Sequence, residues 1–236
     1  MKDRHHYSGI MFDIKFSEIV QGSFPDLKIL QIEANVTNSP TSDELWEEID
    51  KAGEELKEKY PLQELNKRES IAATRRAYKK LGKDPNRYRP SAEALGRRII
   101  NGKGIYRLST LIDVINLVSI KTGYSIGGFD ASKISGKTLT LDAGRADDEF
   151  NAIGRGILNI EGLPVYRDEK GGIGTPTSDE ERTKITPETS NLLMLVNIYG
   201  EEMKVEEIKS FIRDLLEKYA SLKDFNYRII VPDAHS

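Results

Sequence analysis

The sequence of 236 residues contains no cysteine and only three histidines, His5, His6 and His235. Without cysteine, disulfides and thiolate metal sites are excluded. Because the histidines lie only at the two ends of the chain, we expect neither a histidine-based triad nor a zinc site built from several histidines. We therefore predict no metal and no cofactor, and any proton transfer falls to Asp, Glu, Lys, Tyr or water.

Long apolar runs are also missing. The longest is Leu192–Val196, far short of the ~20 residues that a membrane helix needs. The first sixteen residues contain neither an apolar core nor a small-residue cleavage site, so we predict no signal peptide. We expect a soluble, cytoplasmic protein without a membrane partner.

Two glycine-containing segments resemble nucleotide-binding loops but lack the residues that such loops require. Ser135–Thr138 ends like a phosphate loop, but Ala131 stands where the first glycine is required. Gly171–Gly174 is too short for a dinucleotide fingerprint and is typical of a turn. We therefore expect no ATP-dependent ligase activity.

Positive charge is concentrated in one segment of a chain whose net charge is −3. Residues 75–107 contain eleven Lys or Arg and two acids. Such a stripe fits a polyanion such as RNA, and it equally fits a solvated face of two helices whose arginines pair with Glu93 and other acids. The candidate phosphate contacts are Arg75, Arg76, Arg89, Arg97 and Arg98.

The hydrophobic pattern predicts one α+β domain over residues 1–236. Alternating or continuous apolar residues predict strands within 7–37 (including 16–20 and 27–36), at 191–199 and at 225–231. Helices are predicted at about 44–60 behind a capping box at Thr41–Glu44, at 68–81, after a Ser91 cap, at 110–121, and at 204–219. Short strands and turns fill the glycine-rich part between them.

Two polar residues interrupt the most apolar helix. Asp113 and Asn116 are three positions apart and therefore share a face. Polar groups in such a helix either bond a buried backbone group or reach a ligand, and the sequence leaves both open.

A series of short motifs carries a family resemblance over residues 72–197, about half of the chain. The motifs are, in order, A-x-x-R-x-x-Y-x-x-x-G-x-D-P-x-x-Y-R-P-S-x-E-A-L-x-R-R at 72–98, L-I-D-V-x-N-x-V-S at 111–119, G-G-F-D at 127–130, I-x-G at 134–136, E-G at 161–162, V-Y-x-D at 165–168 and R-T-x-I-T-x-x-T-x-N at 182–191. In this order and spacing the chain resembles free-standing relatives of the phenylalanyl-tRNA synthetase beta-subunit editing domain, the tRNA-binding B-three/B-four domain.

The resemblance implies a β-sandwich-like sheet core flanked by helices, with the regions 1–67 and 203–232 as additions. It implies tRNA or aminoacyl-tRNA as partner and hydrolysis of a mischarged aminoacyl-tRNA in trans, without ligase activity. Two alternatives stay open: a non-catalytic module that binds tRNA or a small aromatic ligand, and a small-metabolite enzyme that uses no RNA.

The resemblance also implies a pocket. In synthetase editing domains a Thr-Asn pair contributes to it; Asn116 keeps the second position, and Ile115 replaces the first. Gly127 replaces an expected histidine, and an expected glutamate is replaced near Leu195. We therefore predict Asn116 and Asp113 as catalytic residues and the following residues as the pocket: Gly127, Gly128, Asp130, Tyr166, Asp168 and Arg182.

Overall fold

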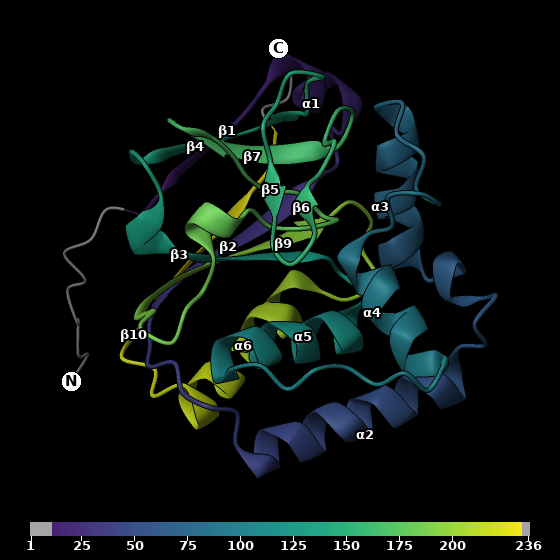
Figure 1. Cartoon of the computed structure of the whole chain (residues 1–236), viewed down its shortest axis with the longest axis vertical. Coiled ribbons are helices and arrows are strands. Elements are labelled where there is room, and N and C mark those ends of the chain that lie inside the picture. Colours follow the sequence, from purple (N-terminus) through teal and green to yellow (C-terminus); the bar gives the residue numbers. More distant parts are fainter. Residues whose placement is uncertain (1–10, 233–236) are drawn as a thin grey trace.

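Two four-stranded sheets are stacked in the structure, a computed structural model that describes residues 11–232 (Figure 1). The first sheet has the strand order β1-β4-β7-β8 and the second the order β10-β2-β9-β3. A two-stranded hairpin, β5-β6, stands apart from both. The strands are β1 (Asp13–Phe16), β2 (Lys28–Asn35), β3 (Ile126–Asp130), β4 (Thr138–Ala143), β5 (Asn151–Ala152), β6 (Gly156–Ile157), β7 (Pro164–Asp168), β8 (Gly171–Gly174), β9 (Asn191–Ile198) and β10 (Asp224–Ile230).

Most of the helices lie on the outer face of the second sheet, whereas α1 lies beside the first sheet. Figure 1 shows α5 and α6 below this sheet, with α2 beneath them and α3 at the side. The helices are α1 (Glu18–Ser23), α2 (Asp43–Lys59), α3 (Glu69–Lys80), α4 (Ser91–Ile100), α5 (Thr110–Thr122) and α6 (Val205–Tyr219). Short 3-10 turns lie at Leu65–Lys67, Ala131–Lys133 and Glu181–Thr183.

Strand β9 belongs to both hydrophobic cores. Leu193 and Leu195 pack in the core between the two sheets, whereas Met194 and Val196 pack against the helices. A strand buried on both faces needs apolar side chains at successive positions, because neighbouring side chains point to opposite sides. The predicted buried strand at 191–199 is thereby confirmed.

The starts of two helices differ from the sequence prediction. Ser42, and not Thr41, caps α2 by accepting a hydrogen bond from the Leu45 N–H. Thr41 is free to donate its hydroxyl to Asp113. Helix α4 has Pro90 at its N-cap, so Ser91 is its first helical residue and makes no side-chain cap.

The strand predicted at 16–20 is wrong. After four residues paired with β4, the chain turns into the short helix α1, which begins when the Ser17 hydroxyl accepts from the Val20 N–H. Phe16–Val20 has a strand-like composition, but the Ser17 cap starts a helix here. Only Val20 of this helix is buried, so little apolar packing favours a strand instead. Residues 7–10 of the predicted strand region 7–37, and the three histidines, lie outside the described residues.

The α+β class with a sandwich-like core and flanking helices is confirmed. The regions 1–67 and 203–232 contribute central elements to it. Strand β2 lies between β9 and β10, and α6 packs in the same core as α5. Within residues 11–232 no helix is both long and apolar enough to cross a membrane.

Leu193→Ala should lower the free energy of unfolding by about 2–5 kcal/mol, because Leu193 is fully buried between the sheets and its loss leaves a cavity. Ile19→Ala, at a half-exposed position, should cost much less. Urea unfolding of both variants measures the difference. Equal losses would contradict the position of β9 in a packed core.

Candidate functional site

A half-open hollow lies between α4, α5 and β3, and the segment after β8 forms part of its wall. Its volume is about 670 Å³. Nineteen residues line it, about half of them apolar and about half polar or charged, and most of its exposed surface is apolar. They are Ser91, Ala94, Leu95, Arg98, Leu108, Ile112, Ile115, Asn116, Ser119, Ile126, Gly128, Ile153, Arg155, Thr175, Thr177, Ser178, Asp179, Lys184 and Ile185. An apolar surface beside polar groups that can orient a ligand is the usual form of a small-ligand site.

Gly128 sets the distance between helix α5 and strand β3. A Cβ atom at this position would lie 2.4 Å from Ile115 Cδ1 and 3.3 Å from Ile185 Cδ1. The glycine therefore lets the helix approach the strand closely, and its backbone N–H stays accessible to a side chain on the opposite wall. Gly127 and Gly128, predicted to allow a close approach, both lie in strand β3, and Gly128 forms part of the cavity wall.

Asp179 is the most perturbed carboxyl of the cavity. Burial raises its pKa from 3.8 to about 7, although the Gly128 N–H donates to Oδ2 at 3.1 Å and favours the charged form. Within residues 11–232 no cation offsets the burial. A carboxyl that titrates near neutral pH in a cavity can accept and return a proton, which marks a candidate catalytic group.

Asn116 lines the same cavity from α5, whereas Asp113 lies behind the wall. The Asp113 carboxylate accepts from the Thr41 hydroxyl and from the Leu108 N–H at 3.0 Å. Burial raises the pKa of Asp113, and Thr41, Leu108 and the Asn116 amide oppose the rise. Asp113 therefore joins the start of α5 to the preceding loop, and its carboxylate lies close to the amide of Asn116.

The other predicted pocket residues are engaged in internal contacts. Asp168 and Arg182 form a two-bond ion pair, with N–O distances of 2.7 and 2.9 Å. Asp130 accepts from Ser132 and Thr189. Tyr166 is buried and donates to Asn197 at 2.6 Å. None of these four residues lines the cavity, and neither does Gly127.

Most arginines of the basic segment have acidic partners. Arg75 and Arg97 bind the two oxygens of Glu93, which is fully buried, at 2.7 and 2.8 Å. Arg76 pairs with Glu69 on the surface. Arg89 is exposed, and no described carboxylate lies within 4 Å of it. Arg98 alone of the five reaches the cavity. The structure thus divides the predicted phosphate contacts into internal pairs and a smaller set of free cations.

Cations also surround the cavity mouth. Arg155 is exposed on the β5-β6 hairpin, and Lys184 pairs with Glu181 beside it. The loop that carries Arg89 contacts this wall, since Ser91 N–H donates to Pro176 O at 2.7 Å. Among residues 11–232 no three His, Asp or Glu side chains are placed to hold a metal ion.

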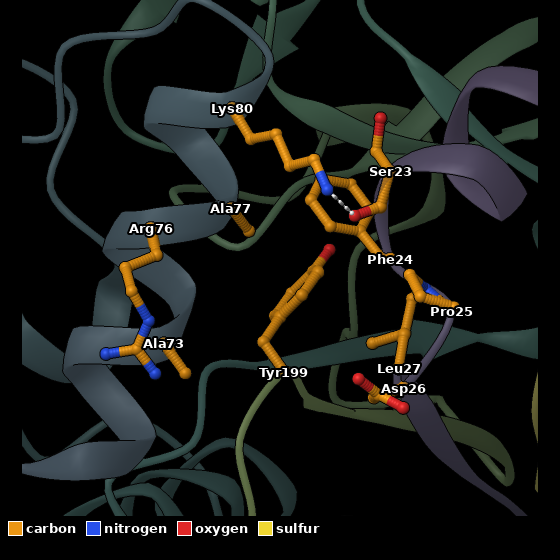
Figure 2. A pocket seen from close by; sticks show the side chains of 10 residues that line it. All are labelled: Ser23, Phe24, Pro25, Asp26, Leu27, Ala73, Arg76, Ala77, Lys80 and Tyr199. Carbon is orange, nitrogen blue, oxygen red and sulfur yellow. Dashed lines mark hydrogen bonds between the residues drawn. The ribbon is translucent and has the colours of Figure 1, made fainter.

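A second hollow of about 270 Å³ lies between α3 and the α1–β2 loop (Figure 2). In Figure 2, Lys80 donates to the Ser23 carbonyl, at 2.6 Å, above the Tyr199 ring. Burial raises the pKa of Tyr199, so its hydroxyl stays protonated at neutral pH. This hollow is smaller than the first cavity and its one carboxyl, Asp26, is exposed, so the first cavity is the better candidate site.

Fold and cavity define an α+β domain with a candidate ligand site beside a β-sandwich. The B3/4 domain family matches residues 73–218, and the chain belongs to this family. A solved structure of similar fold is the crystal structure of an N-terminal fragment of the phenylalanyl-tRNA synthetase beta-subunit from Pyrococcus horikoshii. It has 14% sequence identity and a TM-score of 0.43, over 90% of this chain and 51% of that one. This chain thus spans about half the length of that fragment. A search of curated proteins found no match to this chain.

Sequence reasoning missed Asp179. It stands in the run Ser178-Asp179-Glu180-Glu181, which has the composition of a solvated turn. A Cβ at Gly174 would lie 2.6 Å from Asp179 Oδ1, so Gly174 leaves the space that the carboxyl occupies, and the Gly128 N–H donates to the same carboxyl.

Asp179→Asn should stabilise the protein at neutral pH. The folded state holds the Asp179 proton up to about pH 7, whereas the unfolded chain releases it near 3.8. Stability from this group is therefore lost as pH rises from about 4 to 7. The variant should match wild type near pH 4 and exceed it by roughly 2–4 kcal/mol at pH 8.

The matched control is Asp168→Asn. The pKa of Asp168 is lowered in spite of its burial, through its bonds to Arg182 and two backbone N–H groups, so its loss should destabilise most at neutral pH. Urea unfolding from pH 4 to 8 measures both variants. Parallel profiles for Asp179→Asn and wild type would show that the carboxyl is not held in its acid form.

The double variant Arg75→Met/Arg97→Met should lower the free energy of unfolding by about 3–5 kcal/mol, because Glu93 would remain buried without a cation. Adding Glu93→Gln should restore part of the loss. Arg76→Met, which breaks an exposed pair, should change stability by less than about 1 kcal/mol. A harmless double variant would mean that the two arginines are free for a ligand.

Proposed function

We propose that this chain hydrolyses the ester bond of a mischarged aminoacyl-tRNA in trans, in the cytoplasm. The observation that carries the proposal is Asp179, a carboxyl with a pKa of about 7 in a mostly apolar cavity. A group of this kind takes a proton from water at neutral pH and returns it to a leaving group. Ester hydrolysis needs both transfers.

The reaction runs in two steps on this site. The Asp179 carboxylate accepts a proton from water while the water oxygen bonds to the ester carbonyl carbon. The carbonyl oxygen becomes an oxyanion, which the Asn116 amide stabilises with an N–H donor. The carbon–oxygen bond to the ribose then breaks, and Asp179 returns its proton to the ribose oxygen. The products are a free amino acid and an RNA end that no longer carries an aminoacyl group.

The cavity supplies the surroundings that this chemistry requires. The isoleucines of α5 and β3 form an apolar surface for an amino-acid side chain. Asp113 lies against Asn116 and limits how its amide can turn. Arg155 and Lys184 also line the cavity, and we expect them to contact phosphates of the RNA end, a role that suits cations at the mouth of a site.

One observation favours a second candidate, an esterase for a small molecule without RNA. Arg75 and Arg97 are consumed by Glu93, so the basic segment presents fewer free charges than its composition indicates. The two candidates differ in salt dependence, because a phosphate backbone releases counterions when it binds and a small neutral ester does not.

The test is deacylation of a panel of aminoacyl-tRNAs by the pure protein. Turnover should increase as pH rises through about 7, since the carboxylate is the active form. Asp179→Asn should reduce turnover at least 100-fold, and Asn116→Ala about 10-fold or more, with RNA affinity nearly unchanged. Glu188→Gln, an exposed acid outside the cavity, is the control.

Activity that falls steeply with added salt supports the RNA substrate. Salt-independent hydrolysis of a simple aminoacyl ester, with no activity on any aminoacyl-tRNA, favours the small-molecule esterase. Absence of hydrolysis on both substrate classes would contradict the proposal.

A further inference from the structure

Arg98 differs from every other buried or half-buried arginine in residues 11–232. The others each have a carboxylate oxygen within 4 Å: Arg68 has Glu202, Arg75 and Arg97 have Glu93, Arg167 has Asp148, and Arg182 has Asp168. Arg98 has none among the described residues, and its Nε is buried without a hydrogen-bond partner. A guanidinium removed from water needs an anionic partner, and here the protein does not provide it.

The surroundings of Arg98 hold it in place while leaving it unneutralised. It lies in the last turn of α4, and its guanidinium carbon is 4.6 Å from the centre of the Tyr106 ring. Tyr106 itself is 70% exposed, so the pair stands where the cavity meets solvent. An aromatic ring supports an arginine by cation–π contact without blocking its N–H groups, which remain able to bind two oxygens at once.

Arg98 and Asp179 line the same cavity. The apolar residues Ile112, Ile115 and Ile126 line the same cavity. A ligand that fills this space therefore meets a cation, an apolar surface and a proton-accepting carboxyl.

We propose that Arg98, supported by Tyr106, is an oxyanion subsite that binds a carboxylate or phosphate attached to an apolar or aromatic body. The inference rests on the proposed function for the use of the cavity and adds to it the group that anchors the ligand. If the ligand is an RNA end, the oxyanion is a phosphate. If it is a small acid, the oxyanion is its carboxylate.

Isothermal titration at low salt tests the subsite with three probes: inorganic phosphate, adenosine 5′-monophosphate and 4-methylpentanoate. We expect at least one of the two organic probes to bind. Arg98→Met should weaken that binding at least 10-fold, because it keeps the length of the side chain and removes the charge. Arg98→Lys should lie between, since it keeps the charge and loses the planar fork.

Arg87→Met is the matched control, because Arg87 is an exposed arginine of the same basic segment that lines neither hollow and is not among the candidate phosphate contacts. It should bind the probes as wild type does. Thermal unfolding of each variant shows that a loss of binding is not a loss of fold. Preference for the nucleotide identifies a phosphate ligand, and preference for the alkanoate identifies a carboxylate ligand.

Equal affinity of Arg98→Met and wild type, or no binding of any probe by wild type, would overturn the subsite. The proposed hydrolase can fail separately. Oxyanion binding that depends on Arg98, without ester hydrolysis, leaves the subsite standing and removes the hydrolase. Hydrolysis that depends on Asp179, without oxyanion binding, does the reverse.

Discussion

The contact of helix α5 with strand β3 at Gly128 determines much of the geometry of the site. With any larger residue at this position the Ile115 side chain or the helix would have to move, because Ile115 already occupies the space of a side chain. The same glycine presents its N–H to Asp179, so helix packing and the position of the carboxyl depend on one backbone position. The cavity is a consequence of this approach, since its walls are the two elements that meet there and the segment that folds over them.

The distribution of charge shows how burial changes the meaning of a basic segment. Glu93 is fully buried, and two arginines of the segment turn inward to neutralise it. Such arrangements follow from the large cost of an unpaired buried charge. Positive charge counted along the sequence therefore overstates the charge available to a partner. What remains for a ligand is a small group of cations around one opening.

The elements with strong periodicity could be predicted from the sequence. The helix at 110–121 and the buried strand at 191–199 depend on apolar residues whose spacing fixes their partners, and both form as expected. The short helix at Glu18–Ser23 could not be predicted, because one serine cap decides it against a strand-like composition. Of the predicted pocket residues, Asn116 and Gly128 line the cavity, while Asp168 and Arg182 bind each other. Sequence alone does not show which polar residues meet across the fold, and the position of Asp179 depends on the space that Gly174 leaves in the folded chain.

The central position of strand β2 has a consequence for work with pieces of the chain. The family match covers residues 73–218, but β9 within it is hydrogen-bonded along its whole length to β2, at Lys28–Asn35. A fragment cut at the limits of the match would expose one edge of β9, with a row of unpaired backbone groups and an apolar side chain at nearly every position. Exposed apolar edges of this kind pair with other chains. Such a fragment would therefore tend to aggregate during expression. A fragment that begins before β2 and ends after β10 keeps β9 paired on both edges, with β2 and β3.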